Sequence, residues 1–194
     1  MIIGLTGSIA MGKSEAASYL ASLGLPVFDS DAEVHLLYDS ATGAALIKPL
    51  APSAIRDGKV NRTILSSLVQ QDPAFLSQLE KVVHREIRTR REVFLAKAKS
   101  GGAKAAILDI PLLYETGAET QVDRVIVISA PAELQRQRAL ARAGMSETRL
   151  NLILARQMPD AEKRKRADAV IENGSTVQHM QKHLHALCVK WGLV

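Results

Sequence analysis

Residues 7–14 read Gly7-Ser8-Ile9-Ala10-Met11-Gly12-Lys13-Ser14, which has the form G-x-x-x-x-G-K-S, and they follow the apolar run 1–5. An apolar strand that leads through such a turn into a helix is the context in which this pattern forms a phosphate-binding loop. Gly7 and Gly12 allow backbone angles and close approaches that a Cβ atom would block. The loop N–H groups and the helix N-terminus then face a polyphosphate. The stretch therefore predicts a nucleoside triphosphate site rather than a glycine turn that matches by chance.

We predict a different role for each side chain of this loop. We expect Lys13 to reach the β- and γ-phosphates as a point charge and Ser14 to offer its hydroxyl to Mg²⁺. Ala10 and Met11 stand where glycine or serine is common in such loops, so the loop must hold phosphates through backbone N–H groups. The predicted nucleotide-binding residues are Ala10, Met11, Gly12, Lys13, Ser14 and Glu15.

Size and composition narrow the class of protein. The 194-residue chain can form one domain with insertions, and its 47% hydrophobic and 23% charged residues are typical of a soluble globular protein. No apolar run approaches the ~20 residues that span a bilayer. Because Met1 leads directly into the first predicted strand, we expect no secretory signal and a cytoplasmic location. The only cysteine, Cys188, is expected to pack as a small hydrophobe.

Positive charge is concentrated in one segment. The net charge of the chain is +5, and residues 133–166 contain nine Lys and Arg against four Asp and Glu. This concentration indicates a polyanionic ligand. Aromatic residues make up only 4% of the chain and none lies among these arginines, so we do not expect nucleic acid as a partner. The run Lys163–Arg166 is expected to form either a solvated helix face or a phosphate-facing lid.

Apolar runs alternate with helical patterns along the chain. The runs 1–5, 25–28, 105–108, 124–128 and 169–171 suit buried parallel strands, whereas 39–100 is predicted to be almost entirely helical. This order predicts an α/β three-layer sandwich of the P-loop NTPase type, with a five-stranded parallel sheet between helices. The predicted parts are a core (1–38, 103–132 and 167–194), a helical insertion (39–102) and a basic helical lid (133–166).

Carboxylates follow two of the predicted strands, where open α/β sheets place their chemistry. Asp31 either accepts a proton from an attacking hydroxyl or caps the next helix, and the two roles are compatible. Asp109 ends the run 105–108 and resembles a Walker B acid that holds Mg²⁺. Glu115 follows a proline that breaks the strand, and it either points back at the site or lies exposed at a helix start.

The histidines give weaker signals. His84 lies in an amphipathic helical pattern and is either a packed or surface residue or a substrate contact. His179, His183 and His185 lie on the last predicted helix. No carboxylate or thiolate nearby completes a metal site, so a solvated face is expected there.

Taken together, these motifs resemble the dephospho-coenzyme A kinase family. The string Asp109-Ile110-Pro111-Leu112-Leu113-Tyr114-Glu115 is more specific than the phosphate loop, which many kinases share. One departure is His84-Arg85, where the family usually has His-Pro, and this permits a continuous helix. The matching stretches cover nearly the whole chain: 3–7, 12–14, 27–31, 57–62, Leu79-Glu80 with His84, 109–115, 142–146, Gln157, Ala167-Asp168 and Asn173.

The resemblance implies transfer of the γ-phosphoryl group of ATP, with Mg²⁺, to the ribose 3′-hydroxyl of dephospho-coenzyme A. The insertion would bind the acceptor and the basic segment would close over ATP. Asp31 matches the acid near the acceptor hydroxyl, as base or positioning group. Lys13 and a lid arginine, Arg142 before Arg138, would neutralise developing charge. Asn173 would approach the adenine, Ser14 and Asp109 would hold Mg²⁺, and the predicted acceptor-binding residues are Asp31, His84, Asp109, Leu112 and Glu115.

Two other classes of function remain open at the level of sequence. Another P-loop kinase for a nucleoside monophosphate or a sugar acid explains the loop, the insertions and the lid, but not 109–115 together with 29–31. A nucleotide-dependent switch or a nucleic-acid-binding protein is the lesser alternative, because the chain has no N-K-x-D string. A monomer is the default expectation.

Overall fold

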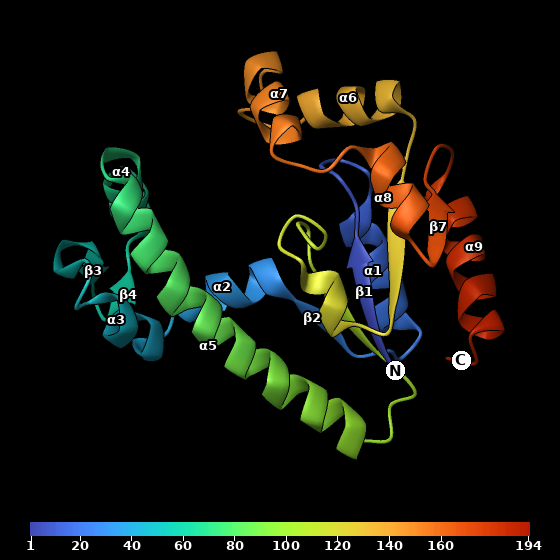
Figure 1. The fold of residues 1–194 in the computed structure, drawn as a ribbon, viewed down its shortest axis with the longest axis horizontal. Helices are drawn as coiled ribbons and strands as arrows, with labels where there is room; N and C mark the ends of the chain where they lie inside the picture. Colours follow the sequence, from blue (N-terminus) through green and yellow to red (C-terminus); the bar gives the residue numbers. More distant parts are fainter. The chain divides into compact units, whose positions relative to one another are not determined.

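A five-stranded sheet lies at the centre of the larger of the two units of the fold (Figure 1). The computed structural model describes residues 1–194, apart from the side chain of Pro73. The strand order is β2-β5-β1-β6-β7, and β1 pairs in parallel with both β5 and β6. The apolar runs predicted from the sequence fall on these strands, which are β1 (Ile2–Thr6), β2 (Val27–Asp29), β5 (Ala106–Asp109), β6 (Arg124–Ser129) and β7 (Ala169–Glu172).

Alternate residues of the central strands face two separate apolar layers. Ile126 and Ile128 lie in a buried core that includes residues of the helices α1 (Lys13–Ser22) and α9 (Val177–Lys190). Val125 and Val127 face the opposite side, where they pack with Leu113 from the segment after β5. The predicted α/β sandwich is therefore confirmed.

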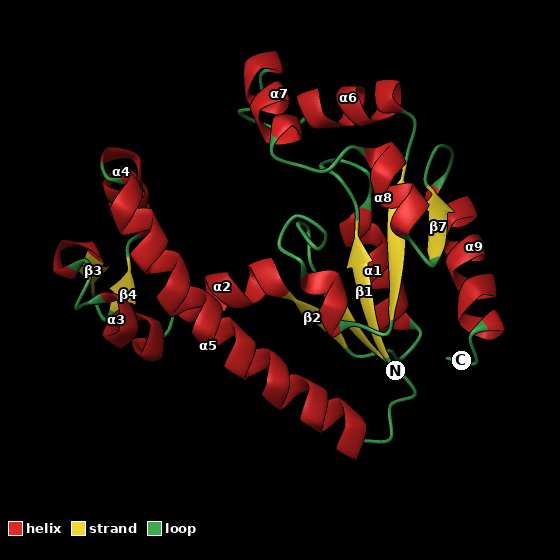
Figure 2. Cartoon of the chain, viewed as in Figure 1, coloured by secondary structure: helices red, strands yellow, loops and turns green.

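Helices and a short turn complete this unit, which comprises Met1–Phe28 and Ala98–Val194. Figure 2 distinguishes the helices of this unit from the strands of its sheet. Cys188 of α9 is fully buried in the core, as expected, and burial raises the pKa of its thiol. The remaining helices are α6 (Ala132–Leu140), α7 (Glu147–Ala155), α8 (Asp160–Arg166) and the 3-10 helix η2 (Ala118–Gln121).

The second unit comprises Asp29–Lys97 and has its own core. It starts before the predicted insertion boundary at 39 because Leu37, on the helix that follows β2, is fully buried against Ile47, Leu65 and other apolar residues of this unit. Its elements are α2 (Ser30–Tyr38), α3 (Ala41–Ile47), the 3-10 helix η1 (Pro52–Ala54), β3 (Ile55–Arg56), β4 (Lys59–Val60), α4 (Arg62–Gln71) and α5 (Pro73–Ser100).

The expectation that 39–100 is almost entirely helical does not include the β3–β4 hairpin. Asp57 and Gly58 form its turn with φ of 49° and 72°, the left-handed backbone that a two-residue hairpin loop requires. Val60 is buried in the core of the unit, which gives the short strand an apolar anchor. The Asp-Gly pair is the sequence signal that marks this hairpin.

Helices α2 and α5 answer two questions that the sequence left open: which aspartate caps α2, and whether α5 is continuous at His84-Arg85. Asp29, not Asp31, caps α2, because the Asp29 Oδ1 accepts the Ala32 N–H at 2.9 Å. Helix α5 continues through His84-Arg85 without a break.

Among the described residues, no helix combines the length and the apolarity needed to cross a bilayer.

Candidate active site

The phosphate loop joins β1 to α1 through two left-handed residues. Ala10 has φ 62° and Gly12 has φ 96°, so the chain turns sharply before the helix starts at Lys13. Gly12 is the N-cap of α1 and no side chain caps this helix. The first N–H groups of a helix have no partner within it, so those of Lys13, Ser14 and Glu15 are available to an anion.

Close packing explains both glycines of the motif. A Cβ on Gly7 would lie 2.6 Å from the backbone oxygen of Ile128, and a Cβ on Gly12 would lie 2.0 Å from the Nδ2 of Asn173. Gly7 therefore lets the loop approach β6, and Gly12 meets both a steric and a conformational demand.

Ala10 and Met11 turn their side chains into the protein. Met11 is 1% exposed and its Sδ accepts the Ala130 N–H at 3.0 Å, while Ala10 is 6% exposed. The Met11 N–H donates to the Ser8 oxygen at 3.2 Å and the Met11 oxygen accepts from Asn173, so the side chain and the backbone of Met11 are both held within the protein. Phosphate binding through backbone N–H groups therefore stays a prediction for the other residues of the loop.

Lys13 and Asp109 form an ion pair at the end of the sheet. Strand pairing explains the meeting, because Leu5 of β1 is the register partner of Asp109 on β5 and the loop starts just after β1. The Asp109 side chain is 1% exposed and that of Lys13 is 15% exposed, whereas Ser14 lies exposed at the start of α1. The predicted phosphate lysine and the predicted magnesium acid are therefore neighbours.

Asn173 holds the loop rather than pointing freely outward. It is 5% exposed, and its Nδ2 donates to the Met11 oxygen at 2.9 Å. Its own backbone oxygen accepts from the Nη1 of Arg138 at 2.9 Å. Arg138 is thus engaged in the framework, whereas Arg142 is exposed and, within the described chain, has no ion pair. This difference favours Arg142 as the arginine that meets a phosphate.

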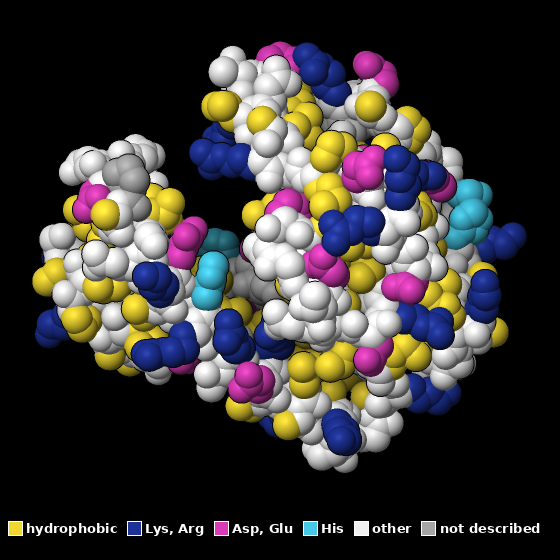
Figure 3. Space-filling view, viewed as in Figure 1, with side chains coloured by type: hydrophobic (Ala, Val, Ile, Leu, Met, Phe, Trp, Pro, Cys, Tyr) yellow, Lys and Arg dark blue, Asp and Glu magenta, His cyan; other side chains and the backbone are white. Residues whose placement is uncertain are grey.

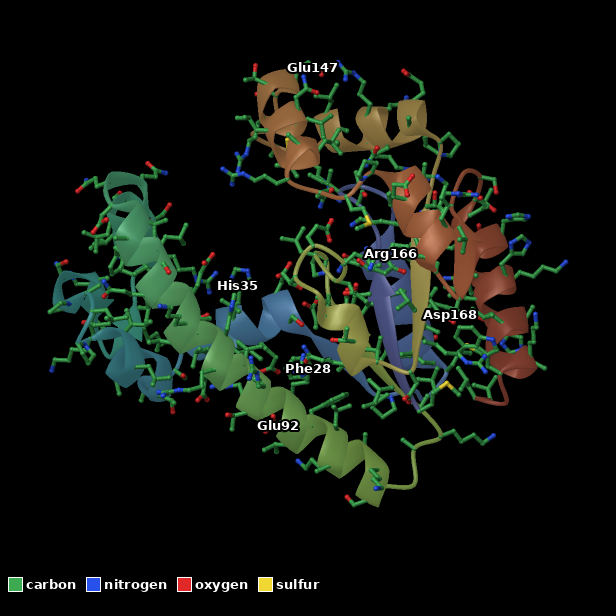
Figure 4. All side chains as sticks on the ribbon, viewed as in Figure 1. Phe28, His35, Glu92, Glu147, Arg166 and Asp168 are labelled. Carbon is green, nitrogen blue, oxygen red and sulfur yellow. The ribbon has the colours of Figure 1, made fainter. Side chains whose placement is uncertain are left out.

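The basic run 163–166 does not form a free phosphate-facing surface. All four cations have acidic partners, and Figure 3 shows blue and magenta side chains next to each other around α8. The expectation of a solvated face is wrong for Lys163, whose side chain is 0% exposed and lies 2.8 Å from Glu115. Arg166, labelled in Figure 4, also lies 4.6 Å from the centre of the Tyr114 ring. The other pairs are Arg164–Glu172, Lys165–Glu162 and Arg166–Glu119.

Glu115 is a partly buried acceptor, not an exposed residue at a helix start. Its side chain is 15% exposed, and its Oε1 accepts the Met158 N–H at 2.7 Å in addition to facing Lys163. Burial alone would raise the pKa of Glu115, but the Lys163 ammonium and the Met158 N–H outweigh it and lower the pKa below the ordinary glutamate value. This carboxylate therefore joins the segment after β5 to the basic segment 133–166.

Sequence reasoning missed a pair of glutamines at the loop. Gln157 Oε1 accepts the Ile9 N–H at 3.0 Å, and Gln135 Nε2 donates to the Ile9 oxygen at 2.9 Å. Gln157 belongs to the stretches that carry the family resemblance, whereas no motif of the sequence points to Gln135. Only the structure shows that Gln135 is 8% exposed on α6, because the sequence of this helix does not mark a buried face.

The remaining predicted residues lie on other segments of the chain, each within its own unit. In the unit 29–97, Asp31 is exposed in the first turn of α2 and His84 is exposed on α5. Leu112 is 38% exposed in the segment after β5. His179, His183 and His185 are exposed on α9, and no metal-ligand cluster of three or more residues occurs among the described side chains.

A family model matches most of the chain. The model described as dephospho-CoA kinase matches residues 1–179. The chain belongs to the dephospho-CoA kinase family. Relatives named dephospho-CoA kinase include one from Agrobacterium fabrum, which is 47% identical over 99% of this chain and 98% of its own length. Another, from Bradyrhizobium diazoefficiens, is 48% identical over 94% of this chain and 92% of its own length.

Solved structures agree with this membership of the dephospho-CoA kinase family. TT1252 from Thermus thermophilus has a TM-score of 0.82 and 36% identity and covers 98% of this chain and 97% of its own. Dephospho-CoA kinase from Campylobacter jejuni has a TM-score of 0.74 and 26% identity, with coverage of 100% and 98%. A shikimate kinase from Acinetobacter baumannii, at 20% identity and a TM-score of 0.56, shares the fold.

Proposed function

We propose that this chain transfers the γ-phosphoryl group of ATP to the ribose 3′-hydroxyl of dephospho-CoA, giving CoA and ADP. The observation that carries the proposal is the uncapped phosphate loop with its Lys13–Asp109 pair, in a chain that matches this family over residues 1–179. In the reaction the hydroxyl oxygen bonds to the γ-phosphorus, and the bond from that phosphorus to the β–γ bridging oxygen breaks. The hydroxyl proton leaves to a base.

The loop supplies the positive end of the site. The N–H groups at the start of α1 bind the phosphate oxygens, and the Lys13 ammonium stabilises charge on the transferred group. Arg142 is exposed and unpaired within the described chain, and it supplies the second cation. Asp31 accepts the hydroxyl proton or orients the hydroxyl, and its exposure and its freedom from capping α2 support this role.

Two oxygen-bearing side chains, one at the start of α1 and one at the end of β5, suit Mg²⁺. The Ser14 hydroxyl and the Asp109 carboxylate are the hard ligands that this ion prefers. Because the described residues contain no cluster of three potential ligands, water and phosphate oxygens would complete its shell. When bound, the ion would neutralise charge on the β- and γ-phosphates.

An assay with four acceptors tests the proposal against another P-loop kinase. ADP formation from Mg-ATP is measured with dephospho-CoA, adenosine, AMP and gluconate, and ³¹P NMR identifies the ester formed. We expect turnover with dephospho-CoA and a new 3′-phosphomonoester. Turnover with AMP or gluconate and none with dephospho-CoA would reject the proposal. The monomeric state and the cytoplasmic location belong to the same proposal.

A further inference from the structure

The basic segment 133–166 holds one residue of the phosphate loop, Ile9, through both its N–H and its carbonyl oxygen. Gln157, between α7 and α8, accepts the Ile9 N–H at 3.0 Å, and Gln135 of α6 donates to the Ile9 oxygen at 2.9 Å. We call these two side chains the glutamine clasp. Ile9 directly precedes Ala10 in the loop.

The partners determine how each amide is oriented. A backbone N–H needs an acceptor, so Gln157 must present its oxygen, and a backbone carbonyl needs a donor, so Gln135 must present its NH₂ group. Gln135 is 8% exposed, which keeps water from replacing its bond easily. The two glutamines therefore have opposite chemical requirements at one residue, in the two peptide groups that flank the Ile9 Cα.

The clasp sits beside the strained part of the loop. Ala10 has φ 62°, a conformation that is unfavourable for a residue with a Cβ and persists only when its surroundings hold it. Next to it, Met11 is fixed through its sulfur and its carbonyl oxygen by Ala130 and Asn173. External contacts thus set the loop geometry on both sides of Ala10.

We propose that Gln135 and Gln157 are positioning residues that couple the segment 133–166 to the phosphate loop. The clasp holds the backbone on both sides of the Ile9 Cα in the shape that binds ATP. Bound ATP in turn stabilises the clasped position of the segment, because such coupling is reciprocal. The proposal rests on the ATP-dependent function above. It assigns the two glutamines no contact with substrate.

Matched charge variants test the opposite requirements of the clasp. Gln157→Glu keeps an accepting oxygen for the Ile9 N–H, whereas Gln135→Glu puts a carboxylate against the Ile9 carbonyl. Gln137→Glu is the control, because Gln137 lies exposed on the same helix and its side chain makes no hydrogen bond within the described chain. All three variants add one negative charge to the basic segment.

We expect Gln135→Glu and Gln157→Glu to differ in their affinity for ATP, measured by calorimetry without acceptor. Gln135→Glu should raise the Kd for ATP about tenfold over the control, the size expected for an unsatisfied buried carbonyl, while Gln157→Glu stays within about threefold of it. Gln157→Met should behave like Gln135→Glu. Amide hydrogen exchange supplies a second readout, in which the Ile9 N–H is protected in the wild type and in Gln157→Glu but not in Gln157→Met.

The outcomes separate this proposal from the proposed function. ATP affinity of folded Gln135→Glu and Gln157→Met equal to that of the control would overturn the clasp even if the wild type phosphorylates dephospho-CoA. If Gln135→Glu fails to fold, Gln157→Met and its exchange pattern decide alone. A wild type that binds ATP but does not act on dephospho-CoA would reject the function and leave the clasp standing.

Discussion

At the scale of single residues, the string 109–115 shows how one short motif serves both the site and the framework. Asp109 faces Lys13 at the phosphate loop, whereas Glu115 binds Lys163 and the Met158 N–H. The resemblance implied an acceptor-binding role for Glu115. The contacts support a framework role for this carboxylate, because its Oε1 is already engaged inside the protein.

Replacing Lys163 should therefore destabilise the fold. Lys163→Met removes a fully buried cation and leaves the Glu115 carboxylate without its charge partner, which costs about 3–5 kcal/mol of unfolding free energy. Urea unfolding followed by circular dichroism measures the change. Lys165→Met is the matched control, because Lys165 is 71% exposed in its pair with Glu162 and its loss should leave the midpoint unchanged. Equal midpoints for both variants would contradict the buried role of Lys163.

The Lys163–Glu115 pair predicts that the free energy of unfolding depends on pH. Because the pKa of Glu115 is lower in the folded chain than in the unfolded chain, its ionised form stabilises the fold. This contribution is fully present above the ordinary glutamate pKa of about 4.3 and is lost as the pH falls through the lower folded value. The stability advantage of the wild type over Glu115→Gln should shrink below that pH in urea titrations. An advantage that grows towards acid pH would contradict the assigned direction.

At the scale of elements, the sequence predicts the sheet well because its strands are buried apolar runs bounded by turn residues. The hairpin 55–60 was missed because two-residue strands are too short to show a period, although Asp57-Gly58 gave the turn. The phosphate loop and Asp109 were predictable from local motifs. The ion pairs of α8 and the glutamine clasp were not, because each joins residues far apart in the sequence, such as Ile9 and Gln157.

At the scale of the whole molecule, the residues expected to act on the acceptor are divided between the two units of the chain: Asp109, Leu112 and Glu115 share the unit of the phosphate loop, whereas Asp31 and His84 do not. The phosphate loop, Asp109 and Arg142 belong to the unit 1–28 and 98–194, whereas Asp31 and His84 belong to the unit 29–97. The framework of the phosphate loop is built from contacts within its own unit, through Gln135, Gln157 and Asn173. Binding of ATP should therefore be separable from the chemical step by mutation.

Asp31 provides the test of that separation. Asp31→Asn should lower kcat with dephospho-CoA by about 10²-fold or more, because general-base or hydroxyl-positioning groups contribute on that order. The Kd for ATP should not change, since no residue of the phosphate loop depends on Asp31 for its contacts. Asp57→Asn is the control: it removes a negative charge from the same unit at an exposed turn whose left-handed backbone asparagine also adopts. Near-normal kcat in Asp31→Asn, or weakened ATP binding equal to the loss of turnover, would show that this carboxylate does not act on the acceptor hydroxyl.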